Sequence, residues 1–255
     1  MPGAAAFFDL DRTLLRRSSA LALAGSFRDR GMISRTQLLK AAAWQLLFVA
    51  RGAGHEAVRA AAEDGLRILE GYTPEELREL VVEALEPILR PLVYAEPLRL
   101  VEQHRDRGDR VYIVSATLQE IVQAIADDLG FDGALGTVCE VRDGRYTGRA
   151  VRALHAANKA DCVREVAARE GFDLAACTAY SDSHTDIPFL EAVGRAVAVN
   201  PDRELRRAAA ARGWPVLEFS DRAYPHARRR LPSPGLALPL LAGVAAVAAA
   251  RRRGR

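Results

Sequence analysis

Short apolar runs alternate with amphipathic stretches over much of the chain. The first run, residues 4–8, is closed by polar residues and predicts a buried strand. Three further β-branched or apolar runs predict strands at 111–114, 178–180 and 196–199. Helical patterns are found at 97–107, after Thr117, at 159–171 and at 187–193. This alternation predicts an α/β fold, a Rossmann-like parallel sheet flanked by helices.

Between the first and second predicted strands, residues 18–90 show only helical patterns, interrupted by glycine and proline. The clearest helix start is Thr73-Pro74-Glu75-Glu76, where a capping hydroxyl precedes a first-turn proline and two carboxylates favoured by the helix dipole. We expect a helix over 74–89. The insertion predicts an all-helical cap attached to the α/β core.

A β-hairpin is predicted over residues 137–151. Its turn is Asp143-Gly144, a dipeptide suited to the positive φ angles of tight hairpin turns. We expect the hairpin to lie beside the main sheet. The predicted organisation is then a catalytic core of residues 1–15 and 95–220, a helical cap of residues 16–94, and a tail of residues 221–255.

The composition is that of a folded globular protein, with 49% apolar and 27% charged residues among 255. The net charge of +3 is more than accounted for by seven arginines after position 227, so the folded part need not be basic. No basic stripe is interleaved with aromatic residues, and we therefore expect a small-molecule partner and no nucleic acid. The three cysteines form no CxxC pair, which favours a reducing cytoplasm.

Polar residues follow the predicted strands, where ligands of open parallel sheets bind. Asp9, Asp11 and Thr13 follow the first strand and Ser115 the second, and the third is followed by Ser181, Asp182, Ser183 and Asp186. Lys159, one of only two lysines in the chain, opens a helix between them. Each group alone has an ordinary explanation as a turn or a helix cap. Their order along the chain favours a shared site.

This mixture of carboxylates, hydroxyl and ammonium suits phosphoryl transfer, where Mg²⁺ takes oxygen ligands and donors surround the developing charge. A carboxylate can attack phosphorus and form an acyl phosphate, and Asp9 is the candidate nucleophile. Asp11 is the candidate general acid and base, since it lies two residues away. Lys159 offers a compact ammonium that can pair with Asp9 and a phosphate.

These residues resemble the four motifs of the haloacid dehalogenase superfamily, over about residues 4–219. The motifs are the segment 7–14 with Asp9 and Asp11, Ser115, Lys159, and the segment 181–186. The helices inserted after the first motif, together with residues 200–202, resemble the phosphoserine-phosphatase-like subfamily IB. The second aspartate of the first motif distinguishes the chain from dehalogenases, which lack it, and from ATP-driven pumps, which carry threonine there.

The resemblance implies a phosphatase in which Asp9 is the nucleophile and Asp11 the acid and base. It further implies phosphate binding by Ser115, Ala116 and Lys159. The implied Mg²⁺ site takes the Asp9 carboxylate, the Asp11 carbonyl and Asp182. Asp186 supports the metal or Lys159.

Three features of the sequence depart from the resemblance. Arg12 stands where related proteins often have glycine or serine, and Ser181 stands where glycine is usual. Arg16 and Arg17 occupy a stretch where phosphoserine phosphatases carry an acidic residue for the substrate amine. These two arginines either bind an anionic group of the substrate or are exposed arginines at a cap hinge.

The tail contains an uncharged stretch, residues 231–250, flanked by arginines and near the length of about 20 residues that spans a bilayer. Three prolines and many alanines weaken this candidate membrane anchor, and an unanchored tail is the alternative. The leading expectation is a cytoplasmic phosphatase of a small phosphorylated metabolite. The alternatives are a membrane-attached lipid-phosphate phosphatase and a non-catalytic binding module of the same fold.

Overall fold

The computed structural model of the protein describes residues 3–33 and 66–224. Their core is one sheet of seven strands in the order β4-β3-β2-β1-β5-β6-β7. The strands are β1 (Ala5–Phe8), β2 (Arg110–Leu118), β3 (Gly133–Arg142), β4 (Arg145–Arg152), β5 (Thr178–Ser181), β6 (Arg195–Val199) and β7 (Val216–Leu217). All neighbouring strands run parallel except β3 and β4. The predicted fold class is confirmed.

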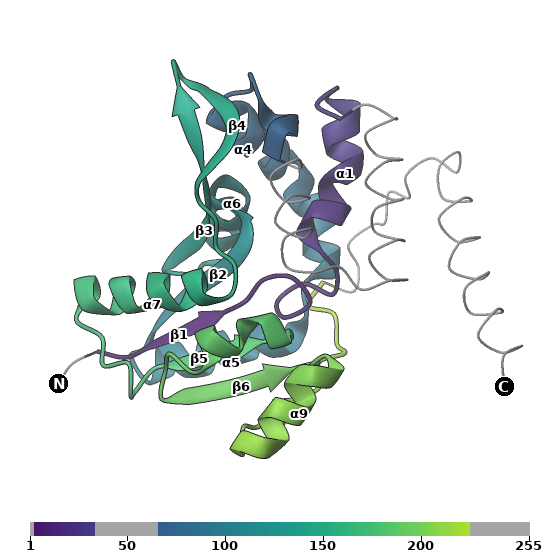
Figure 1. The fold of residues 1–255 in the computed structure, drawn as a ribbon. Coiled ribbons are helices and arrows are strands. Elements are labelled where there is room, and N and C mark those ends of the chain that lie inside the picture. Colours follow the sequence, from purple (N-terminus) through teal and green to yellow (C-terminus); the bar gives the residue numbers. More distant parts are fainter. Residues whose placement is uncertain (1–2, 34–65, 225–255) are drawn as a thin grey trace, which may run out of the picture.

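Helices cover both faces of this sheet (Figure 1). The covering helices are α5 (Ala95–Asp106), α6 (Gln119–Leu129), α7 (Ala157–Glu170), α8 (Ile187–Leu190) and α9 (Arg203–Arg212). Two further helices, α1 (Ser19–Asp29) and α4 (Pro74–Ala84), pack against each other, and α4 packs on α6. Successive side chains of a strand point to opposite faces, so Phe8 and Phe7 belong to two different apolar clusters. The Phe8 cluster includes residues of α1, α4, α5 and α6, whereas the Phe7 cluster includes residues of α7, α8 and α9.

The predicted helix over 74–89 is only partly α-helical. The capping box at its start is present, because Thr73 and Glu76 exchange hydrogen bonds between side chain and main chain. After Ala84 the chain widens into one π-helical turn, η2 (Leu85–Leu89). Pro87 lies in that turn. Proline has no N–H and its ring collides with the preceding turn of an α-helix, which accounts for the change.

The hairpin turn at Asp143-Gly144 is confirmed, and the hairpin lies at the edge of the main sheet, as a continuation of it. Strand β3 pairs in parallel with β2 and thereby extends the main sheet, and β4 forms its edge. The main chain of Tyr146 in β4 also hydrogen-bonds to Gly71 and Tyr72, just before α4. The hairpin therefore ties the inserted helices to the core.

Helix α9 and strand β7 were not predicted. Only Leu205 and Ala209 of α9 are buried, so its apolar face is narrow, and β7 has two residues. The chain then returns to the start of α5, where Ala95 donates to the carbonyl of Asp221 and Ala223 to that of Val93.

No helix in residues 3–33 and 66–224 is both long and apolar enough to cross a membrane. The candidate anchor, residues 231–250, lies outside the described residues, as do residues 34–65 of the predicted cap.

Candidate active site

Asp9 follows β1, at the carboxyl edge of the sheet, and is 5% exposed. Its backbone N–H donates to the carbonyl of Tyr180 in β5, which fixes its position between two central strands. Lys159, in the first turn of α7, places its Nζ 2.7 Å from Asp9 Oδ1. The structure thus brings together two predicted site residues that are far apart in the sequence.

The same ammonium lies 2.7 Å from Asp186 Oδ2, which also accepts a hydrogen bond from Ser181 Oγ. All four residues of this network are buried: Asp9, Lys159, Asp186 and Ser181. Ser181 stands where glycine is usual in the family that the sequence resembles, and its hydroxyl has a defined partner in Asp186. The network holds Lys159 between two carboxylates and orients it toward Asp9.

Burial and partners shift the ionisation of this network. Burial raises the pKa of Asp9 to about 6, although Lys159 acts in the opposite direction. Burial disfavours the ammonium of Lys159, but Asp9 and Asp186 outweigh that effect and its pKa is raised. Lys159 is therefore a fixed positive charge, suited to binding an anion beside Asp9.

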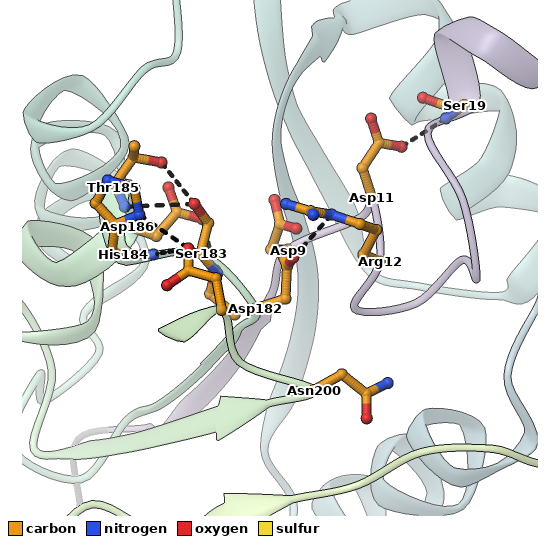
Figure 2. A network of polar contacts seen from close by, with 12 residues as sticks. Asp9, Asp11, Arg12, Ser19, Asp182, Ser183, His184, Thr185, Asp186 and Asn200 are labelled. Carbon is orange, nitrogen blue, oxygen red and sulfur yellow. Dashed lines mark hydrogen bonds and ion pairs between the residues drawn. The ribbon is translucent and has the colours of Figure 1, made fainter. Parts of the chain in front are cut away.

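Asp182 follows β5 and is 4% exposed. Burial, followed by the nearby charge of Asp9, raises the pKa of Asp182 to about 8. Arg12 opposes this shift, since its Nε lies 2.9 Å from Asp182 Oδ2 (Figure 2). Burial and the negative charge of Asp9 therefore outweigh the stabilising effect of Arg12 on the Asp182 carboxylate.

Asp11 is oriented differently from Asp9. Its Oδ1 accepts from the backbone N–H of Ser19 at 2.7 Å, at the start of α1, and in Figure 2 the carboxylate points toward that residue. Burial raises the pKa of Asp11, and the hydrogen bond to Ser19 acts against the rise. A carboxyl group whose pKa is raised is suited to donating a proton near neutral pH.

Ser115 and Ala116 lie toward the carboxyl end of β2, at the same edge of the sheet as Asp9. Ser115 is buried, and its Oγ accepts from the backbone N–H of Thr117 at 3.1 Å. Ala116 is exposed, and its carbonyl accepts from the Thr137 hydroxyl. The Thr117 hydroxyl also lies 3.1 Å from Ser19 Oγ, a contact between β2 and α1 that was not predicted.

The two candidate substrate-binding arginines differ in their surroundings. Arg16 donates to the carbonyl of Ser220 and lies over the ring of Tyr94, with 5.2 Å from its guanidinium carbon to the ring centre. Arg17 is exposed. Arg16 also lines a cavity of about 360 Å³ beside Asp182. Of the two, Arg16 is the one that shares a cavity with Asp182.

Sequence reasoning missed the contribution of the loop after β6. Asp202 donates its backbone N–H to the carbonyl of Asp182, and its carboxylate accepts from the backbone N–H of His184. The same residue caps α9 by accepting from Leu205. An aspartate directly before a helical pattern was the available signal. Asp202 therefore supports the loop that carries Asp182.

The donor set fits a magnesium ion. Mg²⁺ is usually held by one or two carboxylates together with water or substrate oxygens, rather than by an all-protein cage. Among residues 3–33 and 66–224 no group of three or more carboxylate, histidine or cysteine side chains is arranged as such a cage. Asp9 and Asp182 supply only oxygen ligands. Burial raises the pKa of both groups, and a bound cation would stabilise their ionised forms.

Comparison with known proteins identifies the family of the chain. The family model of haloacid dehalogenase-like hydrolases matches residues 6–191. A probable phosphatase of Mycobacterium tuberculosis is 42% identical over 248 residues, covering 96% of this chain and 86% of that protein. The phosphoserine phosphatase SerB1 of the same species is 40% identical over 254 residues, covering 99% and 82%.

A solved structure from Bordetella pertussis, of a protein of unknown function, is also similar. It shares 33% sequence identity with a TM-score of 0.74, covering 85% of this chain and 99% of that one. The chain belongs to the haloacid dehalogenase-like hydrolases. Within that family it is an enzyme of the phosphatase type, and the resemblance drawn from the four motifs is confirmed.

Proposed function

We propose that the protein is a Mg²⁺-dependent phosphomonoester hydrolase that forms an aspartyl phosphate on Asp9. The observation that carries this proposal is the buried network in which Lys159 bridges Asp9 and Asp186, 2.7 Å from each. A carboxylate with a fixed cation beside it, at the edge of the sheet where ligands bind, suits attack on a phosphate.

In the first step, a carboxylate oxygen of Asp9 attacks phosphorus and forms a new P–O bond, while the ester P–O bond breaks. Asp11 gives its proton to the departing oxygen. In the second step, Asp11 takes a proton from water, the water oxygen attacks phosphorus, and inorganic phosphate leaves Asp9 free. Lys159, Ser115 and the main chain at Ala116 bind the phosphoryl oxygens in both steps.

The Asp9 and Asp182 carboxylates and the Asp11 carbonyl would hold Mg²⁺, with Asp186 supporting the site through Lys159. When bound, the ion supplies positive charge that stabilises the phosphoryl group during transfer. Because the network places Asp186 Oδ2 on both Lys159 and Ser181, we assign Asp186 the supporting role rather than direct ligation.

We further propose that residues 16–94 act as a cap over the core formed by residues 1–15 and 95–220. The short connection at Arg16 and the segment before α5 run side by side, since Arg16 donates its N–H to the carbonyl of Leu92 and Tyr94 to that of Leu14. Paired connections of this kind suit a hinge. Closure would exclude bulk water from the aspartyl phosphate.

The substrate class that we favour is a small phosphorylated metabolite. Relatives named phosphatase and phosphoserine phosphatase align over nearly the whole chain. Arg16, however, stands where an acidic residue would bind a substrate amine, and it lies in the cavity beside Asp182. We therefore expect preference for esters that carry a second anionic group.

Three buried, unpaired cysteines, Cys139, Cys162 and Cys177, favour a cytoplasmic location.

The test is phosphate release from a panel of small and lipid phosphomonoesters, with Mg²⁺ and with a chelator. The wild-type protein should hydrolyse at least one ester only when Mg²⁺ is present, and Asp9→Asn should be inactive. Well-folded, Mg²⁺-loaded protein that releases no phosphate from any ester would favour the non-catalytic alternative. Preference for lipid esters would favour the membrane-attached alternative.

A further inference from the structure

Arg12 combines an unfavourable backbone conformation with a specific side-chain contact. Its φ angle is +67°, in the left-handed region that glycine adopts freely and that residues with a Cβ adopt rarely. An arginine in this conformation is less favourable than a glycine would be. We expect a local contact of the side chain to offset the cost of this backbone conformation.

That side chain contacts the Asp182 carboxylate. Arg12 Nε lies 2.9 Å from Asp182 Oδ2, and the two side chains are 61% and 5% exposed. The Arg12 side chain is therefore largely exposed, whereas the carboxylate that it contacts is nearly buried. Figure 2 shows the contact. Both residues line the cavity of about 360 Å³.

Among residues 3–33 and 66–224, no second cation lies at hydrogen-bond distance from the Asp182 carboxylate. Lys159 is committed to Asp9 and Asp186, and the loop contact from Asp202 reaches the main-chain carbonyl of Asp182. The remaining cavity arginines are also engaged elsewhere: Arg206 pairs with Glu218, and Arg16 with Ser220 and Tyr94. Within the described part of the chain, Arg12 is thus the one cation at hydrogen-bond distance from the Asp182 carboxylate.

We propose that Arg12 is a displaceable counter-ion of the metal site: its guanidinium holds Asp182 in place without metal and competes with Mg²⁺ for that carboxylate. This inference rests on the proposed function, because it takes Asp182 as a metal ligand. Arg12 is a positioning residue in this account, acting through Asp182. An exposed side chain can swing into solvent without disturbing the core, so its displacement requires no rearrangement of the fold.

The test is calorimetric titration of MgCl₂ into the metal-stripped full chain. Arg12→Gln keeps the backbone conformation and much of the side-chain length but removes the charge. It should bind Mg²⁺ about two- to fivefold more tightly than wild type, the factor that corresponds to losing a partly exposed ion pair. Arg12→Lys keeps the charge and should lie closer to wild type. The difference should shrink at high ionic strength, where exposed charges are screened.

Arg206→Gln is the matched control, because it removes an arginine from the same cavity whose partner is Glu218 rather than Asp182. Its Mg²⁺ affinity should equal that of wild type. A second readout is the rise in unfolding temperature on adding Mg²⁺, which should be larger in Arg12→Gln than in wild type.

Two kinds of failure are distinguishable. If wild type binds Mg²⁺ and Asp182→Asn does not, but Arg12→Gln binds with equal or weaker affinity than wild type, the counter-ion proposal is overturned and the metal site stands. If Asp182→Asn binds Mg²⁺ as tightly as wild type, the metal site itself is wrong and both proposals fall.

Discussion

Lys159 Nζ lies 2.7 Å from Asp9 Oδ1, although 150 positions separate the two residues in the chain. The contact is buried, and Asp186 completes it on the other side of the ammonium. A buried ion pair of this kind is not evidence of stability by itself, because desolvation opposes it. Its geometry instead places a permanent positive charge beside the proposed nucleophile.

Replacing Lys159 by methionine should abolish phosphate release and lower the unfolding free energy. Two buried carboxylates would lose their common cation, and breaking such a pair by removing one partner costs about 3–5 kcal/mol. Urea unfolding of the metal-free protein measures the loss, and phosphate release measures the activity. Lys159→Arg is the matched control: it keeps the charge and should recover stability better than activity, since a planar guanidinium does not reproduce the compact ammonium. A fully active Lys159→Met protein would contradict the role of this residue.

The proton transfer assigned to Asp11 predicts a dependence on the leaving group. Asp11→Asn keeps an oxygen that can accept from the Ser19 N–H, so the start of α1 should stay capped and the unfolding free energy should change little. Loss of general acid catalysis lowers the rate by about 10²–10⁴-fold. The loss should be greatest for alkyl phosphates, whose leaving oxygens need a proton, and smaller for p-nitrophenyl phosphate. Equal losses for both ester types would show that Asp11 does not protonate the leaving group.

His104 predicts a pH dependence of stability that is separate from the active site. Its ring nitrogens lie 2.7 Å from Asp109 Oδ2 and 2.8 Å from the Tyr180 hydroxyl. Burial lowers the pKa of His104 below its ordinary value of 6.5; the hydrogen bond to Asp109 opposes this effect and Arg107 adds to it. As pH falls through 6.5, the unfolded chain therefore takes up a proton before the folded protein does, and stability decreases.

This contribution is fully present above pH 6.5 and is lost as the pH falls toward the lower pKa of the folded state. Urea unfolding across this range should show a steeper loss of stability in wild type than in His104→Gln, which has no titrating ring. Parallel curves for the two proteins would contradict the assignment.

Gly194 should not tolerate a side chain. A Cβ at this position would overlap the backbone carbonyl of Ala175, and a backbone group cannot move aside as a flexible side chain can. Gly194→Ala should therefore lower the unfolding free energy by about 1–3 kcal/mol or more, the range for overpacking. Gly25→Ala is the control, because it lies within α1 with open space around it and should be neutral or stabilising by about 0.5–1 kcal/mol. A Gly194→Ala protein as stable as wild type would be the contrary result.

The central strands could be predicted from the sequence because their burial is continuous. All four residues of β1 and of β5 are buried, which gives the uninterrupted apolar or small-residue runs that mark strands of a parallel sheet. The π-helical turn at Pro87 could not be predicted, since proline can also bend or end a helix. Strand β7 has only two residues, too few for a periodic signal.

The approximate location of the candidate site could be predicted from the positions of the strands, but its side-chain contacts could not. Residues directly after parallel strands share one edge of the sheet, which places Asp9 and Asp182 near each other. Which side chains touch depends on their length and rotamer, and the contacting residues are far apart in the sequence. The positions of the strands do not determine these contacts. The pairing of Arg12 with Asp182 and the bond from His184 to Asp202 therefore came only from the structure.

The most direct test of the account is to trap the phosphorylated enzyme. The protein would be mixed with the ester it hydrolyses best and Mg²⁺, quenched in acid during turnover, and digested for mass spectrometry. We predict one phosphoryl group on the peptide that contains Asp9, lost on treatment with hydroxylamine, and none in Asp9→Asn. A phosphoryl group on another residue, or sustained hydrolysis by Asp9→Asn, would contradict the proposal that Asp9 carries the covalent intermediate.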